Sequence, residues 1–195
     1  MSESDEILDP TPSQSGTDES VLTDRPATLD GASIGLLSNA KKNSDHFLQS
    51  VGTHLQSVAD IDVSDVVYKP TATSAAPDDI YEELGQYDAV LTAYGDCGSC
   101  SSWTIHDAIQ LEESGIPTVV FCSEEFTTLC QFESENQSCP GLPIVEFEHP
   151  IADVAPEVVR EERVTDAICD EVVEALTSDP ETLRDRYGGR YTDEV

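Results

Sequence analysis

Two cysteines separated by only two residues are the side chains most capable of chemistry in this chain of 195 residues. Cys97 and Cys100 lie in "AYGDCGSCSSWTIHD" (93–107), after a predicted strand and at the start of a predicted helix. The unpaired N–H groups and the dipole at a helix start stabilise a thiolate, which lowers a cysteine pKa below its usual value of about 8.5. Cys97 is therefore the candidate nucleophile, and Cys100 is the candidate resolving thiol that closes a Cys97–Cys100 disulfide.

Two titratable residues close to this pair in the sequence complete the predicted catalytic set. Asp96 directly precedes Cys97, and its negative charge opposes thiolate formation by raising the pKa of a nearby thiol. The same carboxylate can instead accept a proton. His106 lies further along the predicted helix and is a candidate to assist proton transfer. We therefore predict that Cys97, Cys100, Asp96 and His106 carry the chemistry.

Two other interpretations of the CxxC spacing stay open. A structural zinc site needs four protein ligands, and one CxxC supplies two of them. Cys122, Cys139 or His149 would have to complete such a site from other parts of the chain. Alternatively, both cysteines are inert core residues. We assign no metal ligands at this point.

Composition restricts the partners and the compartment. Forty acidic residues against nine basic ones give a formal charge of −31, which excludes nucleic acid as a partner. This excess is typical of a protein from a salty cytoplasm, where salt screens surface carboxylates. No segment resembles a signal peptide or reaches membrane-spanning length. Six irregularly spaced cysteines do not resemble a secreted disulfide framework. We expect a cytoplasmic protein without a membrane partner.

The alternation of apolar segments predicts the elements that position these residues. Residues 1–30 are rich in polar and acidic side chains and are predicted to be a disordered acidic tail. An α/β domain is expected over residues 31–178 and a C-terminal extension over 179–195. The apolar pattern predicts strands over 33–38, 63–68, 88–94, 117–122 and 142–148, and helices over 44–58, 77–86, 101–114 and 156–177. This alternation predicts a three-layer α/β sandwich with a mostly parallel, roughly five-stranded sheet of flavodoxin or Rossmann type.

Polar side chains follow the carboxyl ends of several predicted strands, where open α/β sheets bind their ligands. Asn39, Lys41 and Asn43 follow the first strand, Ser123 ends the fourth, and His149 follows the fifth. These five residues are predicted to bind the substrate and to meet Cys97 and Cys122 at one edge of the sheet.

Lysine is scarce in this chain, and its positions indicate the charge of the ligand. Lys41, Lys42 and Lys69 all lie just past the first two predicted strands, which favours a small anionic substrate. No glycine-rich phosphate loop or dinucleotide fingerprint follows the first strand. We therefore expect no cofactor other than a redox-active Cys97–Cys100 disulfide.

The cysteine motif and its flanks also resemble a known family. The stretch "GDCGSCSSWTIHDAIQLEESGIPTVVFCSEEF" (95–126) is similar to the signature of the UGSC family of proteins and selenoproteins. "SNAKKN" (38–43) resembles the N-x-K-x-N segment of that family, and "HPI" (149–151) also matches. The resemblance covers roughly residues 33–175. In many members, selenocysteine occupies the position that is Cys97 here.

This resemblance implies a thiol version of selenol chemistry. The UGSC family is distantly similar to the selenoprotein B subunits of glycine and betaine reductases, which implies a nucleophile that attacks a small substrate. Cysteine in place of selenocysteine implies a slower version of the same reaction. We predict a thiol-dependent redox enzyme, an oxidoreductase, that acts on a small anionic molecule and receives electrons from a thiol donor. The alternative is a non-catalytic zinc-binding or redox-sensing protein.

Overall fold

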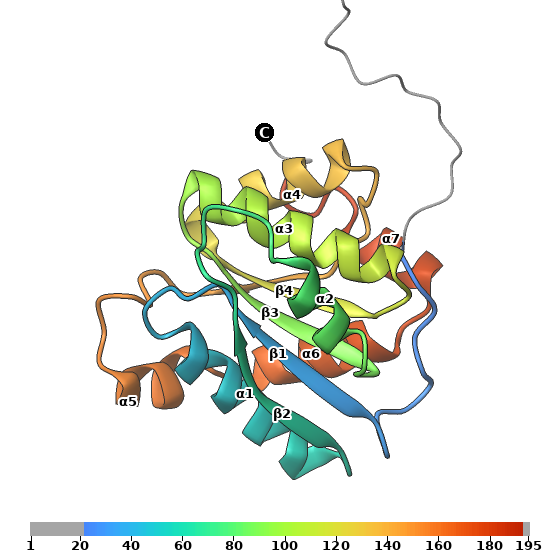
Figure 1. Cartoon of the computed structure of the whole chain (residues 1–195), viewed down its shortest axis with the longest axis horizontal. Coiled ribbons are helices and arrows are strands. Elements are labelled where there is room, and N and C mark those ends of the chain that lie inside the picture. Colours follow the sequence, from blue (N-terminus) through green and yellow to red (C-terminus); the bar gives the residue numbers. More distant parts are fainter. Residues whose placement is uncertain (1–21, 193–195) are drawn as a thin grey trace, which may run out of the picture.

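A five-stranded, all-parallel sheet forms the centre of the computed structural model, which describes residues 22–192 (Figure 1). The strands are β1 (Ser33–Ser38), β2 (Asp62–Tyr68), β3 (Ala89–Gly95), β4 (Thr118–Ser123) and β5 (Ile144–Phe147). Their order across the sheet is β2-β1-β3-β4-β5. The predicted α/β fold class is therefore confirmed, and the order is the flavodoxin-like one.

Helices cover both faces of the sheet (Figure 1). One face carries α1 (Ser44–Val58) and α6 (Asp166–Thr177), and the other carries α2 (Asp78–Leu84), α3 (Gly98–Glu113) and α4 (Thr127–Asn136). Side chains alternate between the two cores, since neighbouring residues of a strand point to opposite faces. Leu36 joins the core under α1, whereas Leu37 packs with α2 and α3.

Two of the predicted helices differ from the structure by more than two residues. The helix after the CGSC motif begins three residues earlier than the predicted range of 101–114, at Gly98. The single helix predicted over 156–177 is divided into α5 (Pro156–Val158), a π-helical turn (Val159–Arg163) and α6. The division falls at Val164, whose backbone is extended, and Thr165, whose side chain caps α6 by accepting from Ile168 N.

The packed part of the chain begins before residue 31. Leu22 and Leu29 are buried in the main core, and the Arg25 guanidinium pairs with the buried carboxylate of Glu112. The prediction of a disordered tail is therefore wrong for residues 22–30, because these few apolar side chains and one cation have partners far along the chain. Residues 1–21 of the predicted tail lie outside the described residues.

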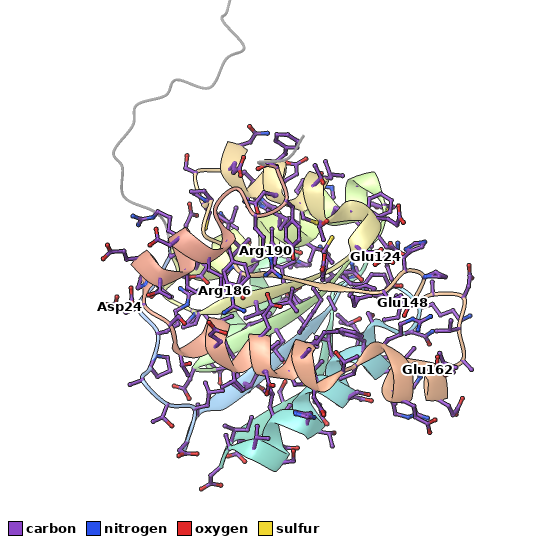
Figure 2. The ribbon with its side chains drawn as sticks, turned by 180° about the vertical axis from the view of Figure 1, so that it is seen from behind. Asp24, Glu124, Glu148, Glu162, Arg186 and Arg190 are labelled. Atoms are coloured by element: carbon purple, nitrogen blue, oxygen red, sulfur yellow. The ribbon has the colours of Figure 1, made fainter. Side chains whose placement is uncertain are left out.

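The C-terminal extension includes a further helix, α7 (Pro180–Tyr187), with Leu183 and Tyr187 buried. Figure 2 shows Arg186 and Arg190 on the side of the molecule where α6 and α7 lie. These two arginines form ion pairs with Glu174 and Glu171 of α6, which hold the extension against the α/β domain.

The strand order creates one switch point, between β1 and β3. The chain leaves β1 for α1 on one face and leaves β3 for α3 on the opposite face. The two loops therefore diverge at the carboxyl ends of these strands, which is the position where ligands bind in this class of fold. Both loops carry residues of the predicted site. Across residues 22–192, none of the helices combines the length and the apolar character that crossing a bilayer requires.

Candidate functional site

Cys97 lies at the switch point between β1 and β3, directly before α3. Its backbone is extended, and no side chain caps the start of the helix. The N–H groups of the first turn therefore remain available to a negative charge at this point. Gly98 and Ser99 are exposed and Cys97 is half-buried, so a small molecule can reach the Cys97 sulfur.

Cys100 lies one helical turn further on and is buried. Its sulfur is 2.7 Å from Cys97 Sγ, and both cysteines are free thiols. Cys100 Sγ is also 3.3 Å from Asp96 Oδ1 and accepts from Asp96 N at 3.4 Å. The sulfur pair is thus close enough for a disulfide to form with a small movement.

Lys41 brings a positive charge to the two sulfurs from the loop after β1. Its Nζ lies 3.8 Å from Cys97 Sγ and 3.5 Å from Cys100 Sγ, and it forms an ion pair with Asp96. The same ammonium lies 5.5 Å from the centre of the Tyr94 ring, within the range of a cation–π interaction. The expected meeting of Lys41 and Cys97 at one edge of the sheet is confirmed.

The environment separates the pKa values of the two thiols. Partial burial opposes ionisation of Cys97, but hydrogen bonds from the Cys100 thiol and backbone N–H and the charge of Lys41 outweigh it, so the pKa of Cys97 is lowered. Burial, together with hydrogen bonding to Cys97, raises the pKa of Cys100 to about 11. The pair therefore consists of a thiolate-forming Cys97 and a protonated Cys100 that stabilises it.

Two predicted binding residues have their side chains engaged within the protein. Asn39 is buried and donates to Tyr94 O at 2.7 Å, while its Oδ1 accepts from Lys41 N at 3.3 Å. Asn43 donates to Ile151 O at 2.8 Å and precedes α1 with a φ of 70°. Both asparagines therefore fix the loop that carries Lys41.

Ser123, the last residue of β4, and His149, two residues after the end of β5, form a pair at the same edge of the sheet. Ser123 Oγ lies 2.8 Å from His149 Nδ1, and the backbone N–H of His149 donates to Glu124 at 3.2 Å. Cys122, next to Ser123, pairs in the sheet with Gly95 of β3. The Ser123–His149 pair therefore lies beside the end of β3, from which the CGSC loop begins. Ser123 is buried and His149 is half-buried.

His106 is not brought to the thiols. Its Nδ1 lies 3.4 Å from Gln137, and its ring packs edge-on against Trp103. From the start of α3 to His106 the helix rises about 12 Å. The contacts of this histidine therefore place it on the α4 side of the helix rather than beside the two sulfurs.

Lys69, one of the three lysines expected near the ligand, instead forms a buried ion pair with Asp107 of α3. Asp107 also accepts from Ala76 N at 2.8 Å and from the Tyr81 hydroxyl at 2.7 Å. This network joins α3 to the segment between β2 and α2. Lys69 therefore fixes the helix that presents Cys97 and is not available to an anionic substrate.

The structure adds two features that the strand-end rule did not predict. Tyr94 lies under Lys41 and donates to the backbone carbonyl of Lys42 at 2.9 Å. Cys122 lies 3.0 Å, sulfur to sulfur, from Cys130 of α4. Cys122 was expected near the site. Cys130 was not, because its segment has no apolar stripe and no helix was predicted there. A helix prediction for this segment would have been needed to place Cys130 next to Cys122.

Among residues 22–192, one group of three side chains could hold a metal ion: Asp96, Cys97 and Cys100, whose ligand atoms lie within 4.8 Å of one another. The additional ligands considered from the sequence do not join it. Cys122 contacts Cys130, and His149 contacts Ser123. The Lys41 ammonium contacts all three members of the group, which opposes the binding of a second cation there.

The fold and the site together define an α/β protein with a flavodoxin-like strand order and a cysteine pair at its switch point. The sequence model of the UGSC family matches residues 6–178, so the chain belongs to the UGSC family. No curated protein matches the chain in a sequence search.

Proposed function

We propose that this chain is a thiol-dependent redox enzyme that acts on a small anionic molecule. The observation that carries the proposal is the arrangement of Lys41, Cys97 and Cys100, in which an accessible sulfur of lowered pKa lies 2.7 Å from a buried thiol of raised pKa. This division of roles is the one that a nucleophile and a resolving cysteine require.

The reaction proceeds in two steps. The Cys97 thiolate attacks an electrophilic atom of the substrate, such as a sulfur of a small disulfide, and the bond to the leaving group breaks with its electron pair. Cys100 then attacks Cys97 Sγ and releases the reduced remainder of the substrate. Asp96, 3.3 Å from Cys100 Sγ, accepts the proton of Cys100 as it attacks. Two thiols become one disulfide, and the substrate gains two electrons and two protons. An external dithiol returns the disulfide to the starting state.

Two features support an anionic substrate. The first-turn N–H groups of α3 lack a side-chain cap, and the exposed Lys42 follows Lys41 in the loop after β1. A chain with a formal charge of −31 repels anions over most of its surface. Lys41, Lys42 and the first-turn N–H groups that do not bond to Cys97 therefore attract anions locally, whereas the rest of the surface repels them. We propose that Ser123 and His149 contact the far end of the substrate.

A trapping experiment tests the proposed function. In the variant Cys100→Ser the resolving step is lost, so we expect the substrate fragment to remain on Cys97 as a stable covalent adduct. The reduced variant is incubated with oxidised glutathione and with a mixture of small anionic metabolites, and the intact mass is measured. The variant Cys139→Ser, which removes a buried cysteine outside the site, should accumulate no adduct. Absence of any adduct on Cys97 in Cys100→Ser would contradict the proposal.

A second candidate is a zinc site, favoured by the proximity of Asp96, Cys97 and Cys100. Zinc commonly takes four ligands, and with these three the fourth position would be left to water. Zinc would also have to displace the Lys41 ammonium. Stoichiometric zinc in the protein purified without chelators would favour this second candidate.

A further inference from the structure

A second pair of thiols lies behind the CGSC loop. Cys122 at the end of β4 and Cys130 in α4 are both fully buried, with their sulfur atoms 3.0 Å apart. This separation leaves only about 1 Å to a bonded sulfur pair. Because neither sulfur is exposed, a reagent in solution cannot reach the pair directly. Any oxidation of this pair must come from inside the protein.

One peptide unit lies between the two thiol pairs. The Cys122 thiol donates to the carbonyl oxygen of Gly95 at 3.4 Å, and the N–H of Asp96, in the same peptide group, donates to Cys100 Sγ at 3.4 Å. The sulfurs of Cys100 and Cys122 therefore lie on either side of the Gly95–Asp96 peptide.

Gly95 faces the buried pair without a side chain. A Cβ at this position would lie 3.0 Å from Cys130 Sγ, 3.2 Å from Cys122 Sγ and 2.8 Å from Ser101 Oγ. The buried hydroxyl of Ser101 has no hydrogen-bond partner in the described part of the chain. The backbone of Gly95 thus lies against both buried sulfurs and against the unpaired hydroxyl of Ser101 in α3.

We propose that Cys122 and Cys130 are a second, internal redox dithiol that reduces the Cys97–Cys100 disulfide. This inference rests on the proposed function, which supplies that disulfide. Cys122, as thiolate, attacks Cys100 Sγ, and Cys97 leaves as a thiolate. Cys130 then attacks Cys122 Sγ and releases Cys100. One disulfide is exchanged for another, the two protons pass from the buried pair to the CGSC pair, and no external reagent is consumed.

The direction of exchange follows from the surroundings of the two pairs. Stabilising one thiolate of a dithiol favours the reduced state of the pair. The disulfide of that pair is therefore a stronger oxidant. The lowered pKa of Cys97 has this effect on the CGSC pair. Burial, with hydrogen bonding to Cys130, raises the pKa of Cys122 well above its usual value, so the buried pair gains no such stabilisation. Electrons therefore move from the buried pair to the CGSC disulfide.

The exchange requires the first turn of α3 to open, so that Cys100 can pass the Gly95–Asp96 peptide. Gly98 and Ser99 in this turn are exposed, and a Cβ at Gly98 would meet no atom within 4 Å. The raised pKa of Cys122 also makes its thiolate scarce. The exchange is therefore slower than closure of the Cys97–Cys100 disulfide, within the range of seconds to hours that disulfide reshuffling takes.

Disulfide mapping over time tests the inference. The fully reduced chain is mixed with one molar equivalent of oxidised glutathione, in the salt at which circular dichroism shows it folded. Samples are quenched with acid, alkylated in denaturant and analysed by peptide mass spectrometry. We expect the Cys97–Cys100 disulfide first and its replacement by a Cys122–Cys130 disulfide later. In Cys130→Ser the first disulfide should persist at least about tenfold longer, whereas Cys139→Ser should match the wild type.

The outcomes separate the two claims. A Cys97–Cys100 disulfide that forms and persists unchanged in the wild type overturns the internal dithiol and leaves the proposed function standing. Formation of the Cys122–Cys130 disulfide at the wild-type rate in Cys97→Ser also overturns it, because the buried pair would then be oxidised by another route. If no Cys97–Cys100 disulfide forms at all, the proposed function fails and the exchange fails with it.

Discussion

Serine in place of Cys97 is expected to lower the rate of substrate reduction by at least about 10³-fold, because a serine hydroxyl is not ionised at neutral pH and cannot replace the thiolate. The measurement is the reduction of oxidised glutathione, or of the substrate found by trapping, with dithiothreitol as the electron donor. The half-buried position of Cys97 predicts little change in the free energy of unfolding.

The matched control for Cys97→Ser is Cys139→Ser. It makes the same chemical change at a buried cysteine, and its activity should stay close to that of the wild type. Activity retained by Cys97→Ser within a few-fold of the wild type would remove Cys97 from the mechanism. Activity lost equally in both variants would show that the assay reports folding and not the thiolate.

Replacement of Asp107 with asparagine is expected to lower the free energy of unfolding by about 3–5 kcal/mol, since it leaves the Lys69 ammonium buried without a counter-charge. Both side chains of this pair are 1% exposed. Urea unfolding at fixed salt measures the loss.

The double variant Asp107→Leu with Lys69→Met is the control for the Asp107 prediction. Removing both charges leaves no uncompensated ion, so its stability should be higher than that of Asp107→Asn. The loss of the acceptor for Tyr81 and Ala76 remains in this variant. A loss below about 1 kcal/mol in Asp107→Asn would show that the pair does not hold α3 as described.

The sequence predicted the sheet well because four of its strands, β1, β3, β4 and β5, are short apolar segments whose residues are mostly buried. The predicted strand over 33–38 and helix over 44–58 coincide with β1 and α1. Helix α4 was not predicted, since the buried residues of Thr127–Asn136 are Thr127, Cys130, Gln131 and Ser134. Small and polar side chains on the buried face of a helix leave no hydrophobic periodicity to detect.

The sequence could predict the location of those site residues that directly follow a strand. Lys41 and Cys97 follow the carboxyl ends of parallel strands, so the fold class places both at one edge of the sheet, and the observed strand order makes their strands neighbours. The roles of Asn39 and Lys69 could not be predicted in this way. Their partners, Tyr94 and Asp107, are 55 and 38 residues further along the chain, and only the packing of α3 reveals that these polar groups are already satisfied.

The pH dependence of the alkylation of Cys97, measured separately from that of Cys100 by peptide mass spectrometry, tests most directly whether Cys97 is the activated thiol. We expect the rate with iodoacetamide to rise with a midpoint below that of a free cysteine in denatured protein, because the hydrogen bonds from Cys100 and the charge of Lys41 lower the pKa of Cys97. Cys100 should react only at much higher pH, since its pKa is raised to about 11. In Lys41→Met the midpoint should move upward and the rate at neutral pH should fall roughly threefold to tenfold. Lys42→Met, the same change at the exposed neighbour, should leave both unchanged. A midpoint for Cys97 at or above that of the free cysteine in the wild type would contradict its assignment as the nucleophile.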